Sequence, residues 1–164
     1  MILQLASELV WKHLQQELFA VLGMVTDKGE ARTVGVVYTV HNQKLYIVSD
    51  KDTWKVRHIS HNPCVSITVP IAKHIPVLFW LKIPSATITF AGQAHVQGAE
   101  CVSQEVLRSL LRGMDMTAEK LGALCVIEVE PVGDFITYGV GVSLMTMRQP
   151  DKARGRAPVA VTAS

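Results

Sequence analysis

Two neighbouring stretches of the sequence carry side chains suited to binding a phosphate group. Ser49 ends a predicted strand, and Thr53, Trp54 and Lys55 begin the helix that follows it. The first turn of a helix exposes unpaired N–H groups and a partial positive charge, which attract an anion. The hydroxyl groups of Ser49 and Thr53 can donate to phosphate oxygens. Arg32, at the start of another predicted strand, can add a bidentate guanidinium group.

The position of Lys55 supports this hypothesis, because the positive end of the helix macrodipole disfavours a cation in the first turn. A bound anion would remove that conflict. A purely structural interpretation stays open, in which Asp52 caps the helix while Arg32, Lys55 and Arg57 face solvent. Asp50 and Asp52 would also repel a phosphate if their carboxylates pointed into the site.

The hydrophobic pattern indicates the elements that would position these side chains. Segments rich in β-forming residues predict strands over residues 19–26, 31–40, 44–49, 64–69, 86–96 and 124–132. Helical spacing predicts helices over residues 4–17, 54–60 and 98–112. We therefore expect a mainly β protein, a β-barrel with peripheral helices, because closing a sheet removes its exposed edges. Residues 1–148 would form a single domain. Residues 149–164 would form a C-terminal tail, either flexible or packed on a partner subunit.

The composition argues against several classes of protein. The chain of 164 residues is 49% hydrophobic and 18% charged, as in globular domains, and its net charge of +2 gives no support for nucleic-acid binding. We expect no membrane span and no signal peptide, because the longest apolar run is short and interrupted and residues 1–10 lack a basic leader. Three scattered cysteines favour reduced thiols in the cytoplasm. No metal site is predicted, since His58 and His61 lack a third ligand.

The segment from Phe19 to Val69 resembles the pyridoxamine 5′-phosphate oxidase-like FMN-binding split-barrel superfamily. The resembling pieces are Phe19-Ala-Val-Leu-Gly-Met-Val-Thr26 with Gly29, Ala31-Arg-Thr-Val34, Lys44-Leu-Tyr-Ile-Val-Ser49, Thr53-Trp-Lys-Val-Arg-His-Ile59 and Asn62-Pro-Cys-Val-Ser66. The predicted strand over residues 86–96, with Gly92-Gln-Ala94, fits the same plan. The resemblance implies a six-stranded split barrel and a homodimer whose interface completes two flavin sites.

The resemblance further implies eight cofactor-binding residues. Those that match the positions holding the flavin phosphate and ribityl chain are Arg32, Ser49, Thr53 and Lys55. The backbone of Thr33 and Val34 would lie along the isoalloxazine ring, and Thr87 stands where members often present a polar side chain to that ring. Trp54 belongs to the same cofactor site, at a position where true pyridoxamine phosphate oxidases carry arginine.

Other departures from the family pattern concern the substrate. The chain has no Arg-x-His near its C-terminus, and no Tyr/Arg/Ser set that would grip a substrate phosphate is recognisable over residues 104–116. Oxidation of vitamin B6 phosphates is therefore not expected. The sequence predicts an FMN-binding flavoprotein, an oxidoreductase with an unidentified small-molecule substrate or electron donor and no assigned catalytic acid or base. The alternative is a non-enzymatic carrier or sensor module that binds a flavin, F420 or haem.

Overall fold

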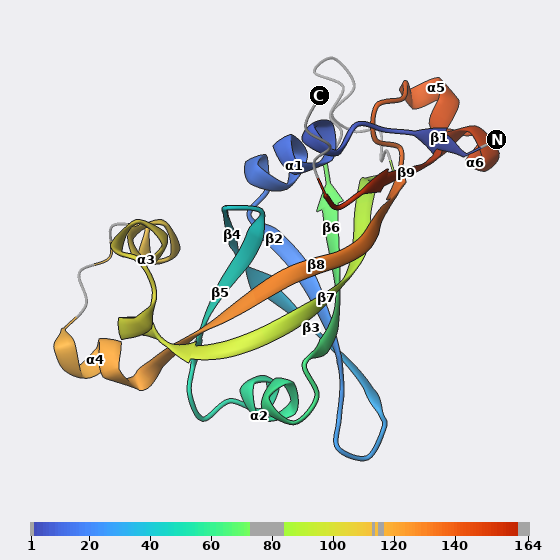
Figure 1. The fold of residues 1–164 in the computed structure, drawn as a ribbon. Coiled ribbons are helices and arrows are strands. Elements are labelled where there is room, and N and C mark those ends of the chain that lie inside the picture. Colours follow the sequence, from blue (N-terminus) through green and yellow to red (C-terminus); the bar gives the residue numbers. More distant parts are fainter. Residues whose placement is uncertain (1, 73–83, 113, 115–116, 161–164) are drawn as a thin grey trace. The chain divides into compact units, whose positions relative to one another are not determined.

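The computed structural model describes residues 2–72, 84–112, 114 and 117–160 (Figure 1). The chain divides into two compact units. The first unit is made of residues 1–17, 68–90 and 133–164, and the second of residues 18–67 and 91–132. Three long strands contribute residues to both units: β6 (Cys64–Ile71), β7 (Ala86–Gly98) and β8 (Leu124–Tyr138). All the predicted site residues except Thr87 belong to the second unit.

The first unit brings the two ends of the described chain into one sheet. Its own elements are β1 (Leu3–Gln4), α1 (Ser7–Gln16), α5 (Leu144–Met147), α6 (Pro150–Ala153) and β9 (Arg154–Pro158). Strand β1 pairs in parallel with β9, and β9 pairs antiparallel with the end of β8. The core is aromatic: the ring of Trp11 on α1 meets Phe135 edge-on at 5.2 Å between centroids, and Phe135 meets Phe90 at 5.3 Å. These edge-to-face contacts fix α1 against the sheet.

Strand β9 lies in the segment that we expected to be a C-terminal tail. Gly155 and Ala157 are buried in the sheet, while Arg154 and Arg156 alternate with them on the exposed side. The Arg156 guanidinium lies 3.6 Å from the Asp134 carboxylate on the neighbouring strand. Because the buried positions hold only a glycine and an alanine, the strand has almost no apolar pattern in the sequence. Residues 161–164 of the expected tail lie outside the described residues.

The second unit contains the strands that surround the predicted site. Its own elements are β2 (Phe19–Val25), β3 (Ala31–Val37), β4 (Thr39–His41), β5 (Lys44–Asp50), α2 (Trp54–His61), the 3-10 helix η1 (Ala99–Cys101), α3 (Gln104–Leu111) and α4 (Ala118–Ala123). The strand order is β5-β8-β7-β6-β2-β3, with β4 beside β5, and β3 also approaches β5. One face of β5 buries Leu45 and Ile47 in the core. The other face carries Tyr46 and Val48, which pack with α3 residues such as Val106 and Leu110.

The prediction of a mainly β fold is confirmed, and the elements differ from expectation in three respects. The described residues form nine strands instead of six, because β1, β4 and β9 are too short to show a periodic pattern. Strand β8 continues to Tyr138, beyond the predicted end at residue 132. The expected helix over residues 98–112 is divided, because Ser103 caps a new helix by accepting a hydrogen bond from the Val106 N–H. No helix within the described ranges is both long and apolar enough to span a lipid bilayer.

Candidate functional site

The hydroxyl groups of Ser49 and Thr53 meet where β5 ends and α2 begins. Their oxygen atoms lie 3.0 Å apart, and they also lie 3.2 Å and 3.1 Å, respectively, from the Asp50 carbonyl oxygen, to which either can donate. Ser49 is only 6% exposed. Three contacts share two hydroxyl protons, so turning one hydroxyl toward an anion sacrifices only part of the network. The two predicted phosphate-binding hydroxyls are therefore close together and able to reorient.

The amino end of α2 has no side-chain cap. Thr53 occupies the cap position in an extended conformation, and its hydroxyl accepts no hydrogen bond from the first turn. The first turn also contains no acidic residue. The structural interpretation in which Asp52 caps this helix is therefore not realised. The uncapped N–H groups keep their partial positive charge for another acceptor, and a phosphate group is a suitable one.

Lys55 lies close enough to this junction for its charge to act there. The buried thiol of Cys125 donates to the Ser49 carbonyl oxygen at 3.4 Å. Burial raises the pKa of Cys125, while the charges of Lys51 and Lys55 pull that pKa in the opposite direction. The Lys51 ammonium is already used, since it donates to the Gly122 carbonyl at 2.7 Å. Lys55 forms no ion pair and no side-chain hydrogen bond with any described residue, so its ammonium is available to an anion.

Arg32 points elsewhere in this structure. Its guanidinium lies 2.7 Å from the Glu30 carboxylate and also donates to the Ala31 carbonyl. Both partners of the ion pair are half exposed, and a pair of this kind contributes little to stability. Within the described residues Arg32 makes no hydrogen bond to Ser49 or Thr53. The guanidinium would have to leave Glu30 before it could bind a phosphate.

The remaining predicted residues occupy three different settings. Thr33 and Val34 follow Arg32 on β3, which ends the strand order of the sheet and pairs with β2 alone along these residues. The outer edge of β3 therefore offers backbone N–H and C=O groups to a ligand or partner. Thr87 lies half-buried on β7 within the first unit. Trp54 is 40% exposed on α2, with its ring centroid 5.8 Å from that of His58.

Trp54 also borders a groove that sequence reasoning missed. The groove has a volume of about 400 Å³ and is lined by Asp27, Trp54, Arg57, His58 and His61. The four α2 residues recur at helical spacing, on the side of the helix opposite its buried residues. That spacing was visible in the sequence. The contribution of Asp27 was not, because the turn between β2 and β3 only comes beside α2 in the folded chain.

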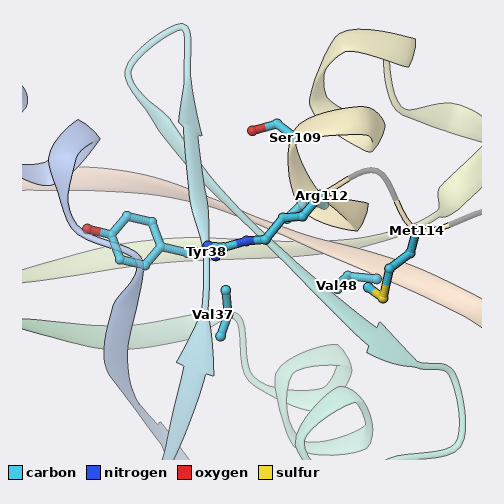
Figure 2. A pocket seen from close by; sticks show the side chains of 7 residues that line it. Val37, Tyr38, Val48, Ser109, Arg112 and Met114 are labelled. Atoms are coloured by element: carbon cyan, nitrogen blue, oxygen red, sulfur yellow. The ribbon is translucent and has the colours of Figure 1, made fainter.

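A second hollow lies between α3 and the strands β3 and β5 (Figure 2). Its volume is about 290 Å³, and apart from Ser109 and Arg112 its lining is hydrophobic or aromatic. Arg112 ends α3 in the left-handed conformation, with φ of 49°, and its side chain runs back across the hollow toward Tyr38. The Ser109 hydroxyl lies 2.7 Å from the Thr39 hydroxyl. Such a hollow fits an apolar molecule with one anionic group.

A third hollow, of about 230 Å³, is lined in part by Tyr46 and Glu128, and Glu128 forms an ion pair with Lys44. The Lys44 ammonium lies 2.6 Å from the Glu128 carboxylate and 3.6 Å from that of Glu130. The hydrogen bond to Glu128 raises the pKa of Lys44. Burial acts to raise the pKa of Glu128, but the hydrogen bond and the charge of Lys44, with smaller contributions from Tyr46 and His95, outweigh burial and lower it. The Glu128 carboxylate that faces this hollow is therefore already paired with Lys44.

Metal binding finds no support in the described part of the chain. No three His, Cys, Asp or Glu residues gather there in a way that could hold a metal ion. His58 and His61 share one side of α2, and Asp27 is the one acidic residue among the described residues that line the same groove.

Comparison with known proteins places the fold. No family model matches the sequence, and no curated protein matches it either. A Listeria innocua protein assigned as a pyridoxamine 5′-phosphate oxidase is 19% identical, with a TM-score of 0.57 over 76% of this chain and 92% of that one. An F420 reductase is 18% identical, with a TM-score of 0.56 over 76% and 93%. The haem storage protein HutZ from Vibrio cholerae is 16% identical, with a TM-score of 0.62 over 84% and 98%. At these identities the likeness establishes the fold, which is the split barrel of pyridoxamine 5′-phosphate oxidase-like proteins.

Proposed function

We propose that this protein is an FMN-binding flavoprotein that acts as an oxidoreductase on a small molecule. The observation that carries the proposal is the junction of β5 and α2. There the hydroxyls of Ser49 and Thr53 converge beside an uncapped helix end, and the Lys55 ammonium has no hydrogen-bonding partner among the described residues. Hydroxyls, helix N–H groups and an ammonium are the donors that a phosphate monoester needs. The split-barrel fold adds support, because it is shared with an F420 reductase.

In this proposal the residues of the chain bind and orient the cofactor. Ser49, Thr53 and Lys55 hold the phosphate, and the free edge of β3 at Thr33 and Val34 offers backbone groups to the ring system. The flavin would supply the hydride or electron chemistry. The hollow in Figure 2 would admit the small molecule, with Arg112 anchoring an anionic group. No side chain is assigned as a catalytic acid or base.

The proposal includes a cytoplasmic homodimer. Phe19 and Val37 face each other across β2 and β3 and are 48% and 51% exposed, which is high for large apolar side chains. Val37 lies on the edge strand β3, which also carries Thr33 and Val34, and Phe19 lies on the adjacent strand β2. A second copy covering this edge would bury the apolar side chains and shield the unpaired backbone.

A second candidate function is storage or transport of a cofactor without catalysis. It is favoured by the similarity in fold to HutZ, which is a haem storage protein. The same uncapped helix end could hold a haem propionate in place of a phosphate, since both groups are anionic hydrogen-bond acceptors.

The absorption spectrum of protein purified from cells tests these two functions. We expect flavin bands that increase when FMN is added, and bleaching of those bands under a nicotinamide reductant with recovery in air. A Soret band with no uptake of FMN would overturn the proposed function and favour haem storage. Bound FMN that no nicotinamide or small-molecule reductant reduces would support a carrier instead of an enzyme.

A further inference from the structure

The groove on the outer side of α2 is built from one exposed ring and four ionisable side chains. Trp54, Arg57, His58 and His61 come from the helix, and Asp27 comes from the turn between β2 and β3. All five lie within the second unit. Helix α2 packs on β2, which brings the turn after β2 to the side of the helix (Figure 1).

Most of these side chains have no polar partner among the described residues. Asp27, Arg57, His58 and His61 form no ion pair and no side-chain hydrogen bond with any described residue. The only ring contact in the groove is that of Trp54 with His58, at an interplanar angle of 60°. The Trp54 side chain is 40% exposed, so part of the indole is accessible to a planar ligand.

The chemistry of the groove matches three parts of one molecule. An exposed indole stacks on a nucleobase, and an arginine with neighbouring histidine N–H groups binds a phosphate. A carboxylate accepts hydrogen bonds from ribose hydroxyls, which explains an acidic residue in a groove that otherwise favours anions. We propose that the α2 groove binds an adenosine phosphate group. Trp54 stacks on the adenine, Arg57 binds the phosphate, and Asp27 accepts from the ribose.

In a flavoprotein, an adenosine phosphate group would be part of a bound dinucleotide. Two sources share this chemistry: the adenylyl half of FAD and the adenosine half of a nicotinamide electron donor. Trp54 directly follows Thr53, so one helix end would serve both the flavin phosphate and the groove. The assignment of the adenosine phosphate to FAD or to a nicotinamide donor rests on the proposed flavin function. Binding of the adenosine phosphate itself does not depend on that function.

Titration of the full-length protein with adenosine 5′-monophosphate (AMP), followed by calorimetry and by tryptophan fluorescence, tests the groove. We expect saturable binding with Kd below about 1 mM. Arg57→Ala should weaken AMP binding by about 10-fold or more and leave adenosine binding unchanged, since adenosine has no phosphate. Trp54→Ala should weaken both ligands by a similar factor. Arg108→Ala, which removes an exposed arginine from α3, is the matched control and should bind AMP like the parent protein.

Absence of saturable AMP binding, or an Arg57→Ala variant that binds AMP like the parent, would overturn the inference. Competition then identifies the source of the group. Displacement of FAD by AMP, without displacement of FMN, assigns the groove to the cofactor. Displacement of NADH or NADPH from FMN-loaded protein assigns it to the donor. AMP that competes with neither dinucleotide overturns the dinucleotide assignment. FMN binding is measured separately, so a protein that binds AMP but no flavin refutes the proposed function and not the groove.

Discussion

Lys55→Ala offers the sharpest test of the phosphate site, because the structure separates the role of this side chain in binding from any role in folding. Lys55 has no ion pair or side-chain hydrogen bond among the described residues, so its removal breaks no contact that holds the chain together. The variant should retain the parent free energy of unfolding within about 0.5 kcal/mol, the range of an ordinary surface substitution. Removing a cation from the first turn of α2 even favours the helix slightly.

The expected loss in binding is large by comparison. A charge-assisted hydrogen bond to phosphate is worth about 1.5–3 kcal/mol. Since 1.4 kcal/mol corresponds to a factor of ten, Lys55→Ala should weaken FMN binding by about 10- to 100-fold. The half-buried position of Lys55 protects the interaction from complete screening, although raising the salt concentration should narrow the difference between parent and variant.

Quenching of flavin fluorescence measures this effect with matched ligands and variants. Riboflavin, which lacks the phosphate, should bind the parent protein and Lys55→Ala equally. Lys51→Ala is the control variant, because that ammonium already donates to the Gly122 carbonyl and is not free for a ligand. The reasoning is refuted if Lys55→Ala binds FMN like the parent. It is equally refuted if the variant loses riboflavin and FMN in the same proportion, because the defect would then lie outside the phosphate.

Three further predictions follow from other parts of the structure. The protein should scatter light with a mass close to twice 18.0 kDa at low micromolar concentration, because a stable dimer interface of this kind buries upwards of about 2,000 Å²; a mass of 18.0 kDa would contradict the dimer. The pKa of Glu128 is lowered in the folded protein, so its ionised form stabilises the fold above the ordinary carboxyl pKa, and this stability is lost as the pH falls through the folded pKa. Glu128→Gln should therefore flatten the fall of the melting temperature as the pH drops below the ordinary carboxyl pKa. Thr137→Val should raise the melting temperature by about 2–4 °C, because the buried Thr137 hydroxyl has no hydrogen-bond partner among the described residues and valine has the same shape as threonine. A lower melting temperature would show that the hydroxyl has a hydrogen-bond partner.

The parts of the site that could be predicted are those formed by elements that follow one another directly in the sequence. Ser49 and Thr53 meet because a strand, a short turn and a helix follow one another directly, and that order is visible in the sequence. The direction of Arg32 was not predictable in this way. Its ion pair with Glu30, which directly precedes β3, depends on side-chain conformation. Sequence pattern indicates which residues a strand carries, but not which of two nearby anions a guanidinium will choose.

The parts that escaped prediction are those with weak periodicity or with partners distant in the sequence. Strand β9 forms around Gly155 and Ala157, whose small side chains fit the sheet without giving an apolar signal. At Gly155 a Cβ atom would lie 2.6 Å from the hydroxyl oxygen of Thr137, its partner on β8, so the sheet requires glycine at this position. The same glycine removes the apolar signal by which the strand could be recognised in the sequence. The α2 groove needs Asp27, which the turn between β2 and β3 brings beside α2 although it lies 27 residues before Trp54 in the sequence.

The alternative hydrogen bonds of the Ser49 and Thr53 hydroxyls affect how fast a ligand can bind. Rotation of a hydroxyl group takes no longer than picoseconds to nanoseconds, and no backbone hydrogen bond has to break for either oxygen to face an incoming anion. Association of FMN should therefore show no conformational gate: the observed rate should rise linearly with FMN concentration and without a plateau, as for a diffusional encounter. Differences in affinity among variants of this junction should then appear in the dissociation rate, so the lifetime of the complex is what these residues control.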